Sequence, residues 1–384
     1  MELIHETGWA APPAAVEPPL TGDIDCDVVV IGGVGGMSAA LRLAEKGTDV
    51  VLLEAQTLGW GASSRNAGYI TNSIAADPEL LGFLLKRERL RTLYRYAENA
   101  VHFAEDAIVR HGIDCGYKSE GIVMAAVSKG QLRHARRNAK VMAEAGSSAE
   151  FVEGREAGLP DGFLGGMREG VGGTLNPHAR RDRRPPHARR DRRPPQTEDE
   201  LTLAGRDRTR CTRATRRDRL DQPRPAGHAA HDHRELPRHP ARHHRVRHRR
   251  VQTGRNPLPD RTPARNVADD LVRGFRERFP GLRDVEPQQA WGGWIGMSST
   301  WLPVAGEASD NVLYSLACNG HGFAQAQYVG HLLADRVGGA PLHDDLAAIW
   351  HGRKRFWPSL VSGPALHATW LADRATDRLA ALTN

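Results

Sequence analysis

The chain has 384 residues, of which 53 are Lys or Arg, 46 are Asp or Glu and 4 are Cys, and its formal net charge is +7. A chain of this length is long enough for two or three domains with sizeable cores. Four cysteines in a chain of this length exclude a disulfide scaffold, and because no two of them form a CxxC pair, a zinc ribbon is excluded too. No run reaches the ~18 apolar residues of a membrane span, and the N-terminus lacks the basic start and apolar stretch of a signal peptide. We therefore expect a cytoplasmic protein.

The positive charge is concentrated in one block, residues 178–266. This block contains 26 Arg, no Lys and 11 acidic residues, a local net charge of +15, whereas the rest of the chain has 27 basic and 35 acidic residues, a net charge of −8. It has no Phe, Trp or Tyr, and the sequence HARRDRRPP occurs twice in tandem, at 178–186 and 187–195. Such a segment cannot bury enough apolar surface to offset its ordering entropy, so the sequence predicts disorder here.

Three interpretations of this block are open. Its arginine density would give a disordered arm affinity for nucleic-acid phosphates. Two histidine pairs spaced four apart, His239 with His243 and His244 with His248, are compatible with metal binding, but Pro240 argues against one helix presenting them, and we expect no metal. Alternatively the block is not native protein sequence, because Arg, His, Pro and Asp without aromatic residues is what a GC-rich gene gives when read out of frame. The flanks favour this third interpretation, and reading the DNA in its other two frames tests it.

The N-terminal flank contains a strand, a glycine turn, a helix and a second strand. Residues 27–31 (DVVVI) form a short run with four consecutive β-branched residues that ends at glycines, which is typical of a strand buried on both faces. The glycine turn 32–36 precedes helix-forming residues 37–46 and a strand over 48–53 that Glu54 closes. This order is that of a dinucleotide site: the glycines let the backbone approach a pyrophosphate, the helix N-terminus stabilises its charge, and the carboxylate accepts ribose hydroxyls.

The glycine turn departs from a strict GxGxxG motif. One register reads Gly33-x-Gly35-x-x-Ser38, with a serine small enough to pack on the strand at the third position. In the other register the loop has lost one residue, and Gly36 is the last glycine. A glycine-rich turn without a ligand is the alternative. The candidate cofactor-binding residues of this motif are Gly32, Gly33, Gly35, Gly36, Ser38 and Glu54.

The segments DVVVIGG and SAALRLAEKGTDVVLLEA, followed by GWGASSRNAG at 59–68, resemble the FAD-dependent D-amino-acid oxidase superfamily. Within it the chain is most similar to glycine/sarcosine-oxidase-like and gamma-glutamylputrescine-oxidase-like enzymes. In such enzymes the GASxRNxG segment runs beneath the flavin, which implies that Ser63, Arg65, Asn66 and Gly68 belong to the FAD site. A polar turn after a strand is the alternative. Arg65 offers a fixed donor fork for a phosphate or a flavin carbonyl.

The resemblance continues in two blocks. Residues 78–110 form one long amphipathic pattern that predicts a helical cover for the sheet, and residues 121–125 resemble the entry into the substrate-domain sheet. The resemblance stops at 173–177 and resumes around Val267. Beyond that point, the resemblance implies that residues 291–293 (WGG) lie near the isoalloxazine ring.

A second turn of interest, CNGHG at 318–322, joins a predicted strand over 311–317 to a predicted helix over 323–337. A glycine-broken turn of this kind points free backbone N–H groups and the positive end of a helix dipole at one spot. In the resembling enzymes that spot is the N1/C2 carbonyl edge of FAD. The resemblance therefore implies that the turn with Gly320, His321 and Gly322 stabilises reduced flavin. We expect His321 to be a local hydrogen-bonding residue, and a role as a base is the alternative.

The chemistry implied by the resemblance is hydride transfer to flavin N5 from the carbon next to an amine, hydrolysis of the imine, and reoxidation by oxygen or another acceptor. No Cys lies between residues 290 and 302 to attach the flavin, so we expect non-covalent FAD. The substrate would be a small amine or amino acid, and no catalytic residue is assigned. The alternatives are a flavoprotein-derived binding protein that uses the basic block on nucleic acid, and an inactive remnant with a corrupted centre.

The expected fold is α/β: a Rossmann-type FAD-binding domain with a second α+β substrate domain, interrupted by the low-complexity Arg/His/Pro-rich block. The expected divisions are an N-terminal tail (1–24), the FAD-binding βαβ unit with the flavin-contact loop (25–75), a helical segment with the first part of the substrate domain (76–177), the anomalous block (178–266), and the return to the FAD domain with C-terminal helices (267–384).

Overall fold

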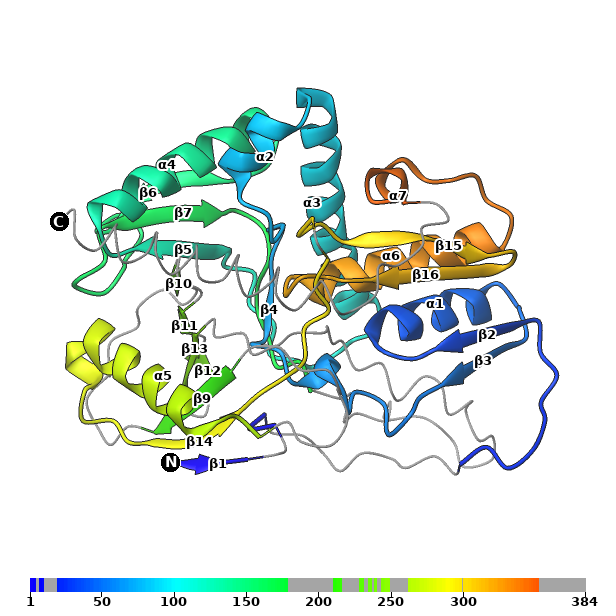
Figure 1. Ribbon diagram of the computed structural model, residues 1–384, viewed down its shortest axis with the longest axis horizontal. Helices are drawn as coiled ribbons and strands as arrows, with labels where there is room; N and C mark the ends of the chain where they lie inside the picture. The colour runs from blue at the N-terminus through cyan, green and yellow to red at the C-terminus, as the bar shows by residue number, and fades with distance from the viewer. Residues whose placement is uncertain are drawn as a thin grey trace.

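The computed structural model describes residues 1–4, 7–9, 19–178, 262–298 and 300–351, together with the backbone of five short strands between residues 210 and 248. The elements divide into two halves, with the long helix α3 (Arg87–Arg110) between them (Figure 1). One half contains the predicted βαβ unit and the other contains the predicted substrate sheet. In the described part of the chain, no helix is long and apolar enough to cross a bilayer.

The βαβ unit forms as the sequence predicts. Strand β2 (Val28–Ile31) leads into helix α1 (Val34–Glu45) and returns as β3 (Val50–Leu53), with β2 and β3 parallel in the register Val28↔Val50 to Ile31↔Leu53. The expectation that the first strand is buried on both faces is wrong, because Val29 is 56% exposed and Ile31 is 82% exposed. Helix α1 covers one face of the β2–β3 pair, and the side chains that alternate to the other face stay exposed.

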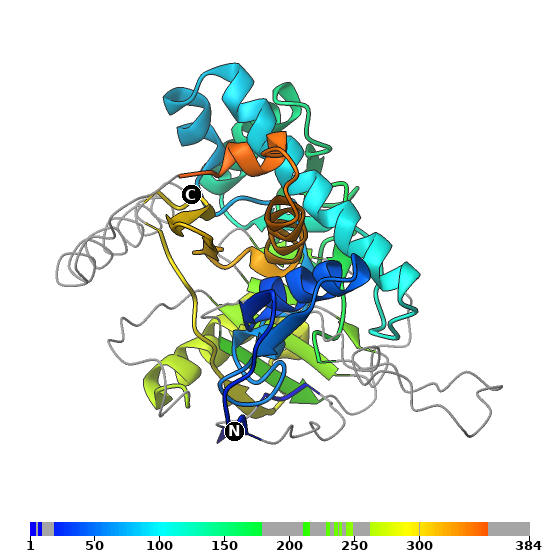
Figure 2. The same ribbon diagram turned by 90° about the vertical axis from the view of Figure 1, so that its right-hand side faces the viewer.

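The CNGHG turn at 318–322 also lies between a strand and a helix, as predicted. Strands β15 (Val304–Ser309) and β16 (Val312–Leu316) form an antiparallel pair, and helix α6 (Gly322–Val337) follows. Helices α1, α6 and α3 lie side by side (Figures 1 and 2), and the short helix α7 (Asp344–Ala348) packs against α3.

The amphipathic pattern over residues 78–110 folds as two helices and not as one. Helix α2 (Pro78–Leu84) begins at the cap residue Asp77, whose carboxylate accepts a hydrogen bond from the Leu80 N–H. The backbone is extended at Leu85 and at the residue after it, so α3 starts a new axis. The sequence pattern did not reveal this break because both segments carry helix-forming residues.

The substrate half contains a mixed sheet in the order β11-β10-β5-β7-β6. Its strands are β5 (Ile122–Ala126), β6 (Glu150–Glu153), β7 (Gly165–Glu169), β10 (His228–Ala230) and β11 (Arg234–Leu236). Helix α4 (Lys129–Glu144), capped by Ser128, packs on this sheet. The two halves are joined by the short antiparallel pair β4 (Tyr69–Ile70) and β8 (Gly173–Thr174).

A second sheet of this half has the order β1-β14-β9-β13-β12. It consists of β1 (Glu2–Leu3), β9 (Arg210–Thr215), β12 (Arg238–His239), β13 (His243–His248) and β14 (Pro287–Trp291), and helix α5 (Arg265–Arg278) packs beside it. The basic block thus contributes five strand backbones to the two sheets. The tandem repeat after His178 and the side chains of the four paired histidines lie outside the described residues.

Candidate cofactor site

The start of α1 is shaped to receive an anion. Gly33 adopts a φ of 87°, and apart from its chain neighbours no atom of the described residues lies within 4 Å of the position that a Cβ would take there. The N-cap residue Gly33 has no side chain to cap the first backbone N–H groups of α1, and the first turn of α1 contains no acidic residue. Free amides at the positive end of a helix dipole stabilise a phosphate group.

The other glycines of the turn are in close contact with the protein. A Cβ on Gly36 would lie 2.6 Å from the Ile31 carbonyl oxygen, so this glycine allows α1 to pack closely on β2. A Cβ on Gly32 would lie 2.6 Å from the Glu54 Oε2 atom, which places the Glu54 carboxylate beside the turn at the end of β3. Ser38 instead lines a small cavity between α1, α3 and α6.

Two further glycines allow α1 and α6 to cross closely. A Cβ on Gly35 would lie 2.9 Å from the Ala326 carbonyl oxygen, and a Cβ on Gly330 would overlap the Gly35 backbone. No side chain therefore separates the two helices at this point. The crossing fixes the start of α6 relative to the start of α1.

The loop 59–68, which the resemblance implies to contact the flavin and which is here called the flavin-contact loop, is held by its own polar groups. The Asn66 side chain donates to the Ser63 carbonyl oxygen at 2.8 Å and accepts from the Gly68 N–H at 2.9 Å. Ser64 Oγ donates to the Gly59 carbonyl oxygen at 2.6 Å. Ser63 and Asn66 are buried, and Gly68 has a φ of 77°. The side chain of Asn66 thus maintains the loop conformation.

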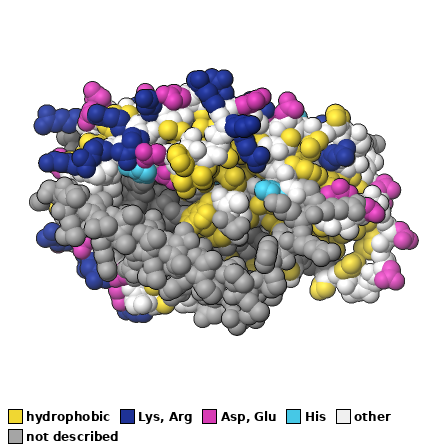
Figure 3. Space-filling view, turned by 45° about the horizontal axis from the view of Figure 1, so that its top comes forward, with side chains coloured by type: hydrophobic (Ala, Val, Ile, Leu, Met, Phe, Trp, Pro, Cys, Tyr) yellow, Lys and Arg dark blue, Asp and Glu magenta, His cyan; other side chains and the backbone are white. Residues whose placement is uncertain are grey.

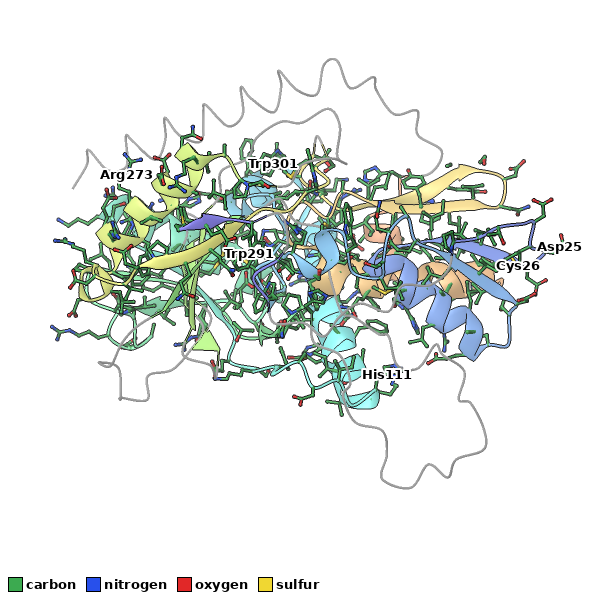
Figure 4. The ribbon with its side chains drawn as sticks, turned by 90° about the horizontal axis from the view of Figure 1, so that it is seen from below. Asp25, Cys26, His111, Arg273, Trp291 and Trp301 are labelled. Carbon is green, nitrogen blue, oxygen red and sulfur yellow. The ribbon has the colours of Figure 1, made fainter. Side chains whose placement is uncertain are left out.

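Arg65 connects this loop to the end of β14. Its side chain is 2% exposed, and Nε donates to the Gly292 carbonyl oxygen at 2.6 Å. Trp291, the neighbour of Gly292, is completely buried where β14 reaches the middle of the molecule (Figure 4). Among the described residues, its Nε1 atom has no hydrogen-bond partner. The structure therefore offers an unused buried donor in the WGG segment.

The turn before α6 has the strained backbone expected of a tight strand-to-helix connection. Ala317, Asn319 and Gly320 have φ values of 56°, 53° and 88°. The Asn319 side chain secures the turn, since its Nδ2 donates to the Ala317 carbonyl oxygen at 2.6 Å and its Oδ1 accepts from the Ser298 N–H at 2.7 Å. His321 is buried and directly precedes α6, and a Cβ on Gly322 would overlap Cys318.

A single hydrophobic cluster brings these separate segments together. It contains Val34 at the start of α1, Ile70 just beyond the flavin-contact loop, and Phe323 at the start of α6. The glycine turn, the loop and the CNGHG turn therefore extend from one core. Their features fit a dinucleotide cofactor: an open glycine turn, uncapped helix amides and a carboxylate at the end of the second strand.

A buried carboxylate at the end of β7 contacts the residues that follow β4. Glu169, at the end of β7, is fully buried, and its two carboxylate oxygens accept hydrogen bonds from the hydroxyls of Thr71 and Ser73. Burial raises the pKa of Glu169 from 4.5 to about 7; the charge of Glu98 acts in the same direction, and the two hydroxyls oppose it. The Ser73 carbonyl oxygen in turn accepts from Gln325 Nε2 on α6 at 2.9 Å. This polar chain connects the substrate sheet to the helix whose start forms the CNGHG turn.

Glu169, Gln325 and Trp9 were not predicted from the sequence as residues of this site. A buried Glu or Gln has no local pattern, because its burial is decided by segments distant in the sequence. Trp9 is 4% exposed and contacts the flavin-contact loop, although residues 1–24 were expected to form a tail. An isolated tryptophan in a Pro/Ala-rich segment was the signal available.

The face drawn in Figure 3 shows Lys and Arg side chains of the described residues mixed with Asp and Glu. Among the described residues, no group of three or more His, Cys, Asp or Glu could hold a metal ion.

Comparison with known proteins gives matches along most of the chain. The family model described as FAD dependent oxidoreductase matches residues 27–180 and 212–336. The chain is 39% identical over 111 residues to gamma-glutamylputrescine oxidoreductase of Escherichia coli (strain K12), covering 29% of this chain and 26% of that protein. It is 25% identical over 390 residues to the probable oxidoreductase OrdL of Rhizobium meliloti (strain 1021), covering 87% and 88%. The first alignment thus spans about a quarter of the relative's length.

Solved structures share the fold. Glycine oxidase from Bacillus cereus ATCC 14579 superposes with a TM-score of 0.64 at 15% identity, covering 87% of this chain and 100% of that chain. Iminodiacetate oxidase from Chelativorans sp. BNC1 gives a TM-score of 0.61 at 16% identity, covering 85% and 100%.

The family match corrects one expectation from the sequence. The resemblance resumes at residue 212 and not near Val267. Strands β9 to β13 account for the difference, because they pair in the two sheets although their sequences lack a β-branched apolar pattern. The resemblance seen in the flanks is confirmed: the chain belongs to the FAD dependent oxidoreductase family.

Proposed function

We propose that this protein oxidises the C–N bond of a small amine or amino acid with non-covalently bound FAD. The observation that carries the proposal is the convergence of the glycine turn, the flavin-contact loop and the CNGHG turn on one hydrophobic cluster. The names of similar proteins support the substrate class: gamma-glutamylputrescine oxidoreductase, glycine oxidase and iminodiacetate oxidase are named for small nitrogen compounds.

Each segment would bind a different part of the cofactor. The open Gly33 turn and the first amides of α1 hold the pyrophosphate, and Glu54 accepts hydrogen bonds from the ribose hydroxyls. Bound FAD would supply hydride acceptance from the carbon next to the amine nitrogen. The N-terminus of α6 would stabilise negative charge on the bound cofactor by its dipole and backbone N–H groups, without a titrating side chain.

The remaining residues of the site position these segments. The Arg65–Gly292 hydrogen bond holds the flavin-contact loop against the WGG segment, and the Gly35–Gly330 crossing holds α6 against α1. Because the chemistry consists of orientation and electrostatics, the site requires no nucleophile or acid–base pair.

The visible spectrum of the purified full chain, taken before and after incubation with FAD and removal of the unbound FAD by desalting, tests the proposal. We expect a flavin band that anaerobic addition of a small amine or amino acid reduces, and a yellow supernatant after acid precipitation. A chain that stays colourless after this treatment overturns the proposal. A yellow chain that no member of an amine and amino-acid panel reduces retains FAD binding but contradicts C–N oxidation.

A further inference from the structure

The N-terminal segment packs between two parts of the candidate cofactor site. Residues 1–4 and 7–9, here called the N-terminal arm, begin as strand β1, which pairs in parallel with β14 in the register Glu2↔Gln289 and Leu3↔Ala290. The Ile4 N–H extends the pairing by donating to the Ala290 carbonyl oxygen at 2.9 Å. The arm is thereby fixed to the strand that ends in the WGG segment.

Beyond β1 the arm contacts the flavin-contact loop. Thr7 Oγ1 donates to the Ser64 carbonyl oxygen at 3.3 Å, and the Trp9 N–H donates to Thr7 Oγ1 at 3.2 Å. Trp9 Nε1 donates to the Asn66 carbonyl oxygen at 2.9 Å in a buried hydrogen bond. The arm therefore satisfies backbone carbonyls of the loop that the loop's own side chains leave available.

At this junction two tryptophans, one in the arm and one in β14, each pack on a glycine of a neighbouring segment. The Trp9 ring occupies the space that a Cβ on Gly68 would need, and the Trp291 ring lies beside Gly8, where a Cβ would come within 3.0 Å of three ring atoms. Trp9 and Trp291 belong to one buried cluster with Ala67. Gly68 has a φ of 77°, so neither its backbone conformation nor its surroundings would accept a side chain.

The geometry points to a role for the arm in FAD binding: Trp9 is a positioning residue that holds the flavin-contact loop in its binding conformation. This inference rests on the proposed function, because the loop matters only if it contacts the flavin. The arm acts on the loop through Asn66 and Gly68 and on β14 through main-chain pairing, so it connects both sides of the Arg65–Gly292 contact. Without it, the loop would have to be ordered by FAD itself, at a cost in affinity.

The test compares Trp9→Ala and Trp9→Phe with the wild-type full chain. FAD affinity is measured by titrating the apoprotein against flavin fluorescence, and loop order is measured without FAD by mass-spectrometric mapping of trypsin cleavage after Arg65. We expect Trp9→Ala to lower FAD affinity by about tenfold or more and to expose Arg65 to trypsin. Trp9→Phe keeps the ring packing and loses the Nε1 hydrogen bond, so its FAD affinity should lie between that of Trp9→Ala and that of the wild type. Phe83→Ala, which removes an aromatic ring that is 86% exposed on α2, is the matched control and should match wild type.

The outcomes separate this inference from the proposed function. If Trp9→Ala and Trp9→Phe bind FAD as wild type does, or leave Arg65 protected, the positioning role is wrong. If Trp9→Ala does not fold, Trp9→Phe decides by the same two measurements. A wild-type chain that does not bind FAD overturns the proposed function and, with it, the role in FAD binding. Loss of trypsin protection in Trp9→Ala would then show only that the arm orders the loop.

Discussion

Replacing the buried Glu169 with Gln would change how the stability of the protein depends on pH. Burial raises the pKa of this carboxyl from 4.5 to about 7 in the folded protein. Below about pH 4.5 the group is protonated in both the folded and the unfolded chain, so it contributes no pH dependence. Between about pH 4.5 and 7 the unfolded chain loses the proton while the folded protein retains it, so the free energy of unfolding falls as the pH rises. Above about pH 7 both states are ionised and the penalty is constant.

The size of this penalty follows from the two pKa values. The gap between 4.5 and about 7 corresponds to ~3 kcal/mol of unfolding free energy. The amide of Gln keeps an oxygen and gains an N–H₂ group to pair with the Thr71 and Ser73 hydroxyls, and it never ionises. We therefore expect Glu169→Gln to match the wild type within about 1 kcal/mol near pH 4.5 and to exceed it by about 2–3 kcal/mol at pH 8.

Urea unfolding followed by tryptophan fluorescence between pH 4.5 and 8 measures this difference. Glu120→Gln, a substitution at an exposed glutamate two residues before β5, is the matched control and should leave the pH profile unchanged. Parallel profiles for Glu169→Gln and the wild type across this range would refute the reasoning, because they would mean that Glu169 ionises in the folded protein as it does in water.

Three further substitutions test the packing and the cofactor site. Asp345→Ala should lower the unfolding free energy by about 3 kcal/mol, because it removes the acceptor of two half-buried donors, Asn99 on α3 and Tyr328 on α6. It also removes the ion pair with the more exposed Arg95; exposed Asp344→Ala should change the unfolding free energy little in the same urea titration. Gly330→Ala forces a Cβ into the α1 backbone and should lower the melting temperature by more than about 5 °C, whereas Gly338→Ala, which has ordinary contacts, should shift it much less. Glu54→Gln should weaken FAD binding about tenfold in a fluorescence titration, and unchanged affinity would remove Glu54 from the ribose site.

Much of the half that contains the βαβ unit could be predicted from the sequence because its signals are local. The order strand, glycine turn, helix, strand and terminal acid specifies β2, α1 and β3, and the structure places their bounds within a few residues of the prediction. The CNGHG turn and α6 could be predicted for the same reason: positive φ values and the start of an apolar helix depend on adjacent residues. The assignment of loop residues 59–68 to the FAD site came from the resemblance to the family and not from a sequence pattern.

The tertiary structure decided the features that depend on distant segments. Ile31 belongs to an apolar strand, yet its exposure depends on which elements cover the sheet. Strands β9 to β13 carry no apolar alternation, and their place comes from pairing with β14 and β5. Trp9 and Glu169 are buried by partners 57 or more residues away along the chain. Local chemistry determines which conformation a short segment prefers, but burial and hydrogen-bond partners follow from the packing of segments that the sequence separates.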